Sequence, residues 1–265
     1  MQSTGIMRLW VSLALIFAVT TPVHAAGTDK FDARQIIERA YEAAGGDAYR
    51  YPKSLHLIGS YLDFRGRLDP VVYAPYELYR VQPRDHPNGH LADGKIRVSS
   101  YLDGKPALQM AFDGTWTYDR NGPTGEGADT PFWRLTMGFG MIRFALEPGY
   151  KIERVADDPV DGKDSYAVRV TDPGGASAIF SIRHGDHRIV KIVFATPRGL
   201  HERVFSDFFT KPGVNWVQPG RVRSSINGIK EAEFLYTDFE IGKDLPDSLF
   251  VIKAGQFPKD AKAAY

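Results

Sequence analysis

The sequence contains no cysteine. This absence excludes disulfide bonds, thiolate metal sites, cysteine nucleophiles and a lipid-modified cysteine at a mature N-terminus. A membrane-spanning run is also lacking near the N-terminus, because the apolar run 9–19 is shorter than the roughly twenty residues that a transmembrane helix needs. The stability of the chain must therefore come from packing.

The N-terminus has the tripartite order of a secretory signal. Arg8 supplies a positive charge, residues 9–19 are apolar, and Val23-His24-Ala25 fits the small-residue motif before a cleavage site. We expect residues 1–25 to be a signal peptide, removed after Ala25, and residues 26–265 to form a single soluble domain in the periplasm. Cleavage after Ala26 and an uncleaved anchor are the alternatives.

An excess of charge of one sign is missing as well. Residues 1–25 contain Arg8 and no acidic residue, so the remaining chain has equal numbers of basic and acidic residues. The basic residues form no block, and phosphate neutralisation by Lys and Arg dominates nucleic-acid affinity. We therefore expect no nucleic-acid partner.

The pattern of apolar residues predicts one helix followed by a mainly β domain. Residues 31–44 carry an apolar stripe at helical spacing, with Asp32 and Gln35 as a capping box and Gly45-Gly46 as the end. From residue 54 the period changes to two, and Asp-Gly or Asn-Gly pairs mark hairpin turns. The predicted strands are 55–64, 77–81, 96–102, 107–112, 115–118, 150–155, 165–170, 178–182, 189–195, 201–209, 220–226 and 233–241.

About a dozen antiparallel strands exceed what an open twisted sheet usually tolerates, so the sequence predicts a strongly curved or barrel-like sheet. Residues 82–93 and 119–131 are expected to be long surface loops, which commonly bind partners or are simply mobile. Residues 131–146 are the most apolar segment after the N-terminus and predict one or two short helices, with Gly138 and Gly140 lowering their helicity.

This apolar segment suggests a ligand. It is apolar nearly all round, so it either forms a core plug or acts as a lid over an apolar cavity, and its periodicity does not separate the two. Flexible methionines favour the lid, because they adapt to varied shapes. The residues expected to line or cover such a cavity are Trp116, Tyr118, Phe132, Trp133, Leu135, Met137, Phe139, Met141 and Phe144.

Catalytic patterns are nearly absent. The sequence has no Gly-x-Ser-x-Gly elbow and no phosphate-binding glycine loop with its Lys-Ser/Thr pair. His184, Asp186 and His187 resemble a metal set but fall at an expected hairpin turn, and His86 and His90 fall in a loop. We therefore assign no catalytic residue, no metal and no cofactor, and expect a binding protein instead of an enzyme.

The order of elements resembles the LolA/LolB-like superfamily of periplasmic lipoprotein carriers, taken broadly. The resemblance rests on the helix end 43–46, the segments 74–80, 112–118 and 164–170, and residues 239–242 before 245–250. It implies an incomplete antiparallel barrel of about 11–12 strands, closed by the N-terminal helix and short lid helices at 132–146. It also implies an apolar cavity for lipid acyl chains. The loops 82–93 and 119–131 are longer than in a minimal carrier.

Three functions follow as hypotheses. The first is a soluble periplasmic carrier of lipid or lipoprotein acyl chains, with no stable membrane anchor after cleavage. The second is a metal-dependent or other hydrolase that uses His184, Asp186 and His187. The third is an envelope module that senses lipids and contacts a protein partner.

Overall fold

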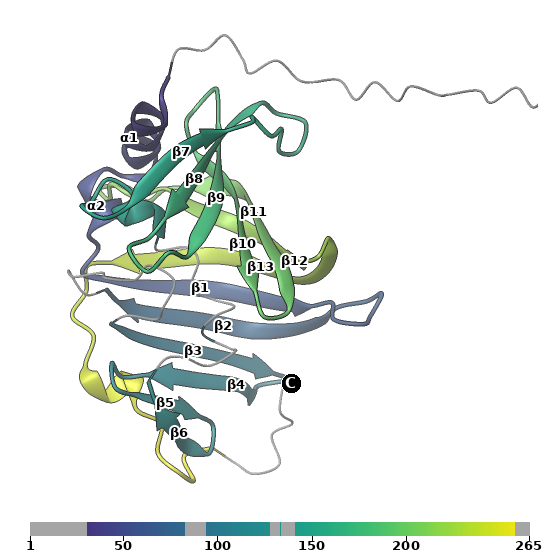
Figure 1. Cartoon of the computed structure of the whole chain (residues 1–265). Helices are drawn as coiled ribbons and strands as arrows, with labels where there is room; N and C mark the ends of the chain where they lie inside the picture. Colours follow the sequence, from purple (N-terminus) through teal and green to yellow (C-terminus); the bar gives the residue numbers. More distant parts are fainter. Residues whose placement is uncertain (1–30, 83–93, 128–132, 134–140, 258–265) are drawn as a thin grey trace, which may run out of the picture.

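A computed structural model describes residues 31–82, 94–127, 133 and 141–257 (Figure 1). The expected signal peptide, most of the loop 82–93 and most of the apolar segment 131–146 lie outside the described residues. The described part contains two α-helices, two 3₁₀ helices and thirteen strands that form one sheet.

The predicted helix is confirmed as α1, Ala33–Ala44. The Asp32 carboxylate accepts from the backbone N–H of Gln35, and the Gln35 side chain accepts from the backbone N–H of Asp32, so the capping box is complete. Gly45 ends the helix with a φ of 131°, a conformation that favours glycine. A short second helix, α2 (Asp47–Arg50), follows directly and was not predicted from the sequence.

All thirteen strands lie in one antiparallel sheet. They are β1 (Ser54–Asp63), β2 (Val71–Val81), β3 (Lys95–Leu102), β4 (Lys105–Phe112), β5 (Trp116–Asp119), β6 (Gly122–Glu126), β7 (Lys151–Val155), β8 (Ser165–Thr171), β9 (Ser177–Arg183), β10 (Ile189–Thr196), β11 (Gly199–Phe209), β12 (Gln218–Ile226) and β13 (Ile229–Ile241). Their order across the sheet is β6-β5-β4-β3-β2-β1-β13-β12-β11-β10-β9-β8-β7. Strands β6 and β7 are the two edges, so the barrel is incomplete, as the sequence predicted.

Strand β6 corrects the expectation of a loop across residues 119–131. Its sequence, Gly-Pro-Thr-Gly-Glu, has no apolar alternation and no β-branched residue except Thr124, so a search for period two passes over it. Proline lacks an N–H donor and is tolerated on an edge strand, which is where Pro123 lies. The turn between β5 and β6, at Arg120 and Asn121, is therefore a tight hairpin.

The sheet is sharply curved near its middle, where β1 pairs with β2 and β13. Figure 1 shows β1 to β6 side by side in the lower half, while β7 to β10 cross them steeply in the upper half. The register of β1 shifts against β13 between Ile58 and Gly59, and against β2 between Gly59 and Tyr61. Such bulges bend a strand and increase its twist. Gly59 is needed there because a Cβ would lie 2.0 Å from the backbone oxygen of Leu235.

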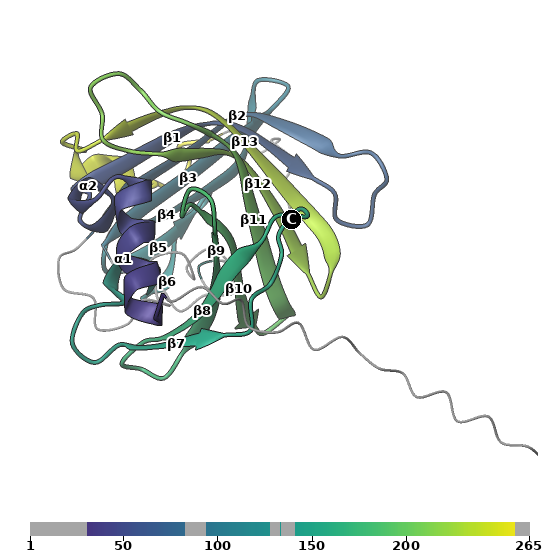
Figure 2. The same ribbon diagram turned by 90° about the horizontal axis from the view of Figure 1, so that it is seen from above.

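Two separate apolar clusters fill the ends of the concave face. The first, the helix cluster, packs α1 against β8, β9 and β10 and includes Ile37, Val168 and Ile192. The second, the tryptophan cluster, surrounds Trp133 with residues of β2, β3 and β4. Figure 2, seen from above, shows α1 lying along the open side of the curved sheet near β7 and β8.

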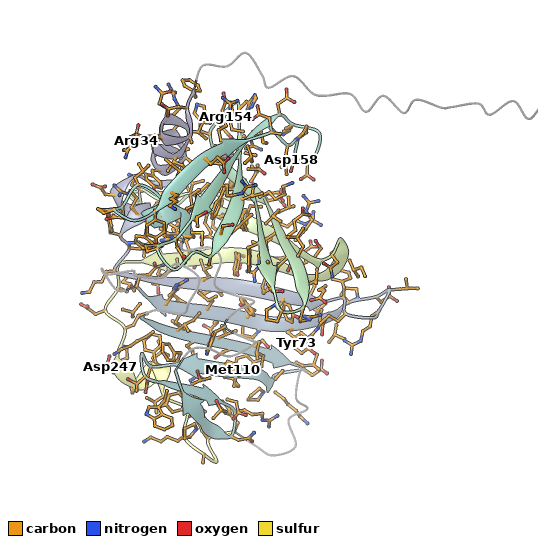
Figure 3. The ribbon with its side chains drawn as sticks, in the orientation of Figure 1. Arg34, Tyr73, Met110, Arg154, Asp158 and Asp247 are labelled. Atoms are coloured by element: carbon orange, nitrogen blue, oxygen red, sulfur yellow. The ribbon has the colours of Figure 1, made fainter. Side chains whose placement is uncertain are left out.

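Polar contacts hold these layers in place. The hydroxyl of Tyr41 on α1 donates to the backbone oxygen of Ile142 at 2.7 Å, and Arg154 of β7 donates to the backbone oxygen of Phe31 at 2.8 Å. Figure 3 labels Arg154 in the upper half, and Met110 of β4, which packs on the tryptophan cluster, in the lower half. On the opposite face of β3, Arg97 donates to the backbone oxygen of Leu249 in the 3₁₀ helix η2 (Asp247–Phe250).

The close approach of β1 and β13 at Gly59 predicts that one added methyl group there lowers the stability of the fold. We expect Gly59→Ala to lower the free energy of unfolding by more than about 2 kcal/mol, because the new Cβ forces β1 and β13 apart. Gly185→Ala is the matched control, since a Cβ there meets no atom within 4 Å, and it should change stability by less than about 0.5 kcal/mol. Urea denaturation of both variants measures the difference, and equal stabilities would contradict the bend at Gly59.

Candidate functional site

A cavity of about 200 Å³ lies on the concave face of the sheet, between the helix cluster and the tryptophan cluster. Its wall takes residues from the end of α1, from α2, from β1 to β3, and from β9 to β13. The aliphatic and aromatic residues of the wall, apart from three tyrosines, are Ala43, Ala44, Leu55, Leu57, Leu78, Ile96, Ile142, Phe180, Ile189, Ile192, Phe205, Phe208, Trp216, Val217, Pro219, Val222 and Phe234. The cavity is therefore predominantly apolar.

The register of the central strands explains why this space is open. Gly59 of β1 lies between Tyr76 of β2 and Tyr236 of β13, and both tyrosines line the cavity. Because glycine has no side chain, the two rings approach each other to 6.2 Å between their centres and form part of the cavity wall. Leu78 and Phe205, which also line the cavity, stay partly exposed although they lie on the concave face. Exposed apolar surface in a hollow favours an apolar ligand.

Four arginines interrupt the apolar wall: Arg80, Arg143, Arg188 and Arg203. Arg143 belongs to the 3₁₀ helix η1 (Met141–Phe144) and is 8% exposed. Its Nη1 donates to the backbone oxygen of Tyr49 at 2.7 Å, and its guanidinium lies 4.4 Å from the centre of the Tyr49 ring. Burial lowers the pKa of Arg143, and the nearby charge of Arg80 lowers it further.

Arg203 joins the wall from β11. Its Nε donates to Nε2 of His201 at 3.1 Å, and its guanidinium lies 5.8 Å from the centre of the Phe234 ring. Burial lowers the pKa of Arg203 to about 10, which still leaves the side chain charged at neutral pH. The cavity thus presents fixed positive charge from two sides.

The residues expected from sequence to line a cavity lie elsewhere or outside the described residues. Phe132, Leu135, Met137 and Phe139 lie outside the described residues. Trp133 is fully buried in the tryptophan cluster, where its Nε1 donates to the hydroxyl of Thr117 at 3.0 Å.

The other expected residues fall into two groups. Met141 is buried in the helix cluster, and Phe144 is buried beside it in η1. Trp116 is 44% exposed on β5, and Tyr118 packs against Ile252 of the C-terminal segment. None of the five described residues is part of the cavity wall, to which the same apolar segment contributes Ile142 and Arg143. Contact of the nine expected residues with a ligand stays a prediction.

The histidine cluster of the second hypothesis forms a turn between β9 and β10. Both carboxylate oxygens of Asp186 pair with Arg183, and Nε of Arg188 lies 3.4 Å from Oδ2. The His184 ring stacks on Tyr166 with 3.9 Å between the ring centres. Among the residues that the structure describes, no group of three His, Asp or Glu is arranged to hold a metal ion. His86 and His90 lie outside those residues.

Comparisons of the structure with solved structures give the fold. A LolA superfamily protein from Nitrosomonas europaea matches with a TM-score of 0.54 and 15% identity, over 84% of this chain and 98% of the other. A DUF1329 family protein from Desulfovibrio piger matches with a TM-score of 0.50 and 11% identity, over 83% and 98%. The chain has a LolA-type fold. No protein-family model matches the sequence, and no curated protein matches it significantly.

The LolA-type fold confirms the resemblance drawn from the sequence. The cavity residues that sequence reasoning missed are inward-facing strand positions, above all Arg80 and Arg203, together with Arg143 of η1. A sequence signal for two of them exists, because Tyr76, Leu78 and Arg80 alternate along β2 and Arg203 and Phe205 along β11. A charged residue at an otherwise apolar inward position of a strand indicates a functional site or a paired charge. Within the described ranges, no helix has the length and apolarity to span a bilayer.

Acidification tests the arrangement around Arg203. Burial, aided by Arg203 and Arg198, lowers the pKa of His201 from 6.5 to about 3, so the folded protein keeps this ring neutral. An unfolded histidine takes up a proton below pH 6.5, so the stability contributed by neutral His201 is lost as the pH falls from 6.5 towards 3.

His201→Gln should be less stable than the wild type at pH 7.5, and the difference in their free energies of unfolding should narrow by about 2 kcal/mol at pH 4.5. Urea denaturation at both pH values measures it. A gap that is independent of pH would show that His201 is not buried in its neutral form.

Proposed function

We propose that this chain is a carrier or binding protein of the cell envelope that holds an acyl chain in the central cavity. The supporting observation is the apolar hollow between two packed clusters of a LolA-type sheet. A fully packed interior would leave no room for a ligand. Among the described residues, side chains fill both ends of the concave face, and a cavity remains between them.

The energetics of the wall suit an acyl chain. Each methylene that leaves water contributes about 0.8 kcal/mol, before the costs of association and ordering are subtracted. Leu57 and Leu78 offer aliphatic contacts on one side, and Ile192 and Phe205 offer contacts on the other. Holding such a chain requires no catalytic group, which agrees with the lack of catalytic patterns in the sequence.

The cellular location is part of the proposal. The order of Arg8, the apolar run 9–19 and the motif ending at Ala25 supports export and cleavage. We propose that residues 1–25 are removed and that the domain 26–265 acts in the periplasm. Protein recovered from the periplasm of an expressing bacterium should begin at Ala26 by intact-mass measurement. A mass that includes residues 1–25 would show that the segment is retained.

A substitution that fills the cavity tests the binding function. We expect Leu78→Trp to weaken uptake of a fluorescent fatty acid by at least tenfold, because the larger ring occupies the space between β2 and β11. Val72→Trp is the matched control, since Val72 lies on the same strand, is 51% exposed and is not part of the cavity wall. It should bind like the wild type.

Fluorescence titration of the two variants, with melting temperatures to confirm folding, gives the comparison. Equal binding by Leu78→Trp and the wild type would place the ligand outside the cavity. Absence of binding by the wild type, together with native mass spectra that show only ligand-free protein, would overturn the proposed function.

A further inference from the structure

The charge of the cavity wall is one-sided. Four arginines line the cavity, and the described residues of the wall include no aspartate and no glutamate. Transfer of a charge from water into an apolar environment is costly unless the charge is paired. A ligand without charge would bring no anion to this wall.

The charge of Arg188 is already paired with a carboxylate. Its Nε lies 3.4 Å from Oδ2 of Asp186, and its guanidinium lies 5.1 Å from the centre of the Phe208 ring. Asp186 lies in the turn between β9 and β10, and Phe208 lies on β11. Arg188 is therefore an internal reference for an arginine of the same wall that needs no further anion.

Arg143 has no such carboxylate. A guanidinium has five N–H donors, and among the described residues its acceptors both belong to Tyr49, the backbone oxygen and the hydroxyl. The centres of the Tyr49 and Trp216 rings lie 4.4 Å and 5.3 Å from Cζ of Arg143, so both rings contact the face of the guanidinium. These ring contacts do not use the N–H donors along its edge. Glu147, four residues later in the chain, accepts instead from Tyr51 and Arg50.

Arg80 adds a second positive charge beside Arg143. The charge of Arg80 acts on Arg143, and Tyr49 is the main group that offsets it. Two neighbouring cations in a shared hollow repel each other and attract an anion placed between them. Arginine also matches the planar geometry of carboxylate and phosphate oxygens.

The size of the cavity limits the apolar part of the ligand. About 200 Å³ is below the roughly 300–1,000 Å³ of pockets for drug-sized ligands. The strands supply most of the aliphatic and aromatic surface of the wall, with Arg80 on β2 and Arg203 on β11, while Arg143 and Tyr49 belong to η1 and α2. An elongated molecule with one charged end and one chain fits this division.

We propose that the cavity binds a single-chain amphiphile with an anionic head, a carboxylate or a phosphate, whose oxygens accept from Arg143 beside Arg80. This inference rests on the proposed function and names the class of ligand. In a carrier of neutral acyl groups, the guanidinium of Arg143, which has no carboxylate partner, would be unfavourable in the binding cavity. The proposal therefore distinguishes this protein from such a carrier.

The test compares three ligands with the same sixteen-carbon chain: palmitate, hexadecyl phosphate and uncharged hexadecanol. Each displaces an uncharged fluorescent probe from the purified full-length mature protein below its critical micelle concentration. We expect the wild type to bind at least one of the two anions at least tenfold more tightly than hexadecanol, because hydrogen bonds to charged groups are worth roughly 1.5–3 kcal/mol. Which anion binds more tightly identifies the head group.

Arg143→Met removes the charge and keeps a side chain of similar length. It should lose the preference for the anions by at least tenfold while hexadecanol binds within threefold of the wild-type value. Arg169→Met, the matched control, should keep the preference because Arg169 pairs with Glu153 and is not part of the cavity wall. Arg143→Lys should retain part of it.

The outcomes separate the two proposals. Failure of the wild type to bind any of the three ligands would overturn the proposed function itself. Equal affinity of the wild type for anions and hexadecanol would overturn only the anionic head, even if Arg143→Met does not fold. An undiminished anion preference in folded Arg143→Met would likewise exclude Arg143 as the partner of the head group.

Discussion

The bend of the sheet at β1 is the constraint on which the rest of the structure depends. Strand β1 is hydrogen-bonded on both sides, and the register shifts on each side of Gly59 turn thirteen strands into two halves that face each other. A flat sheet would leave one face without cover, because among the described helices only α1 is long enough to shield several strands. The bend lets each half shield the other and creates a concave face.

Helix α1 and the tryptophan cluster cover only part of the concave face. Helix α1 packs on β7 to β10, and Trp133 packs in the cluster on β2 to β4. Both therefore cover the end regions of the sheet. The middle is lined by residues of β1, β2, β11 and β13, with the end of α1, α2 and η1 at its border. The cavity is thus a geometric consequence of a large curved sheet with little helix. The edges are protected differently: β6 carries Pro123, and β7 carries Lys151 and Glu153.

Most of the sheet could be predicted from the sequence because its hairpins are short and marked. Pairs such as Asp103-Gly104 and Asn227-Gly228 adopt the positive φ values that such turns require, and they separate adjacent strands. Twelve strands were predicted on this basis. Strand β6 escaped because an edge strand built from glycine and proline has no apolar period, and α2 escaped because four residues are too few for a helical stripe.

The cavity was harder to predict because its wall comes from distant parts of the chain. Alternation along one strand tells which residues share a face, whereas the side that becomes concave depends on bulges such as the one at Gly59. Strong apolarity directed attention to residues 132–146, yet Trp133 and Met141 proved to be core residues. Ile142 and Arg143, at the end of that segment, do reach the cavity. The informative residues were inward-facing arginines, whose meaning appears only once the strands are paired.

A crystal structure of the mature protein soaked with a fatty acid brominated along its chain tests the central claim most directly. The bromine atoms locate the chain by anomalous scattering, independently of any effect on affinity. We expect anomalous peaks inside the hollow, between Leu78 of β2 and Phe205 of β11. Peaks confined to the outer surface, or no ordered bromine at saturating ligand, would contradict the account.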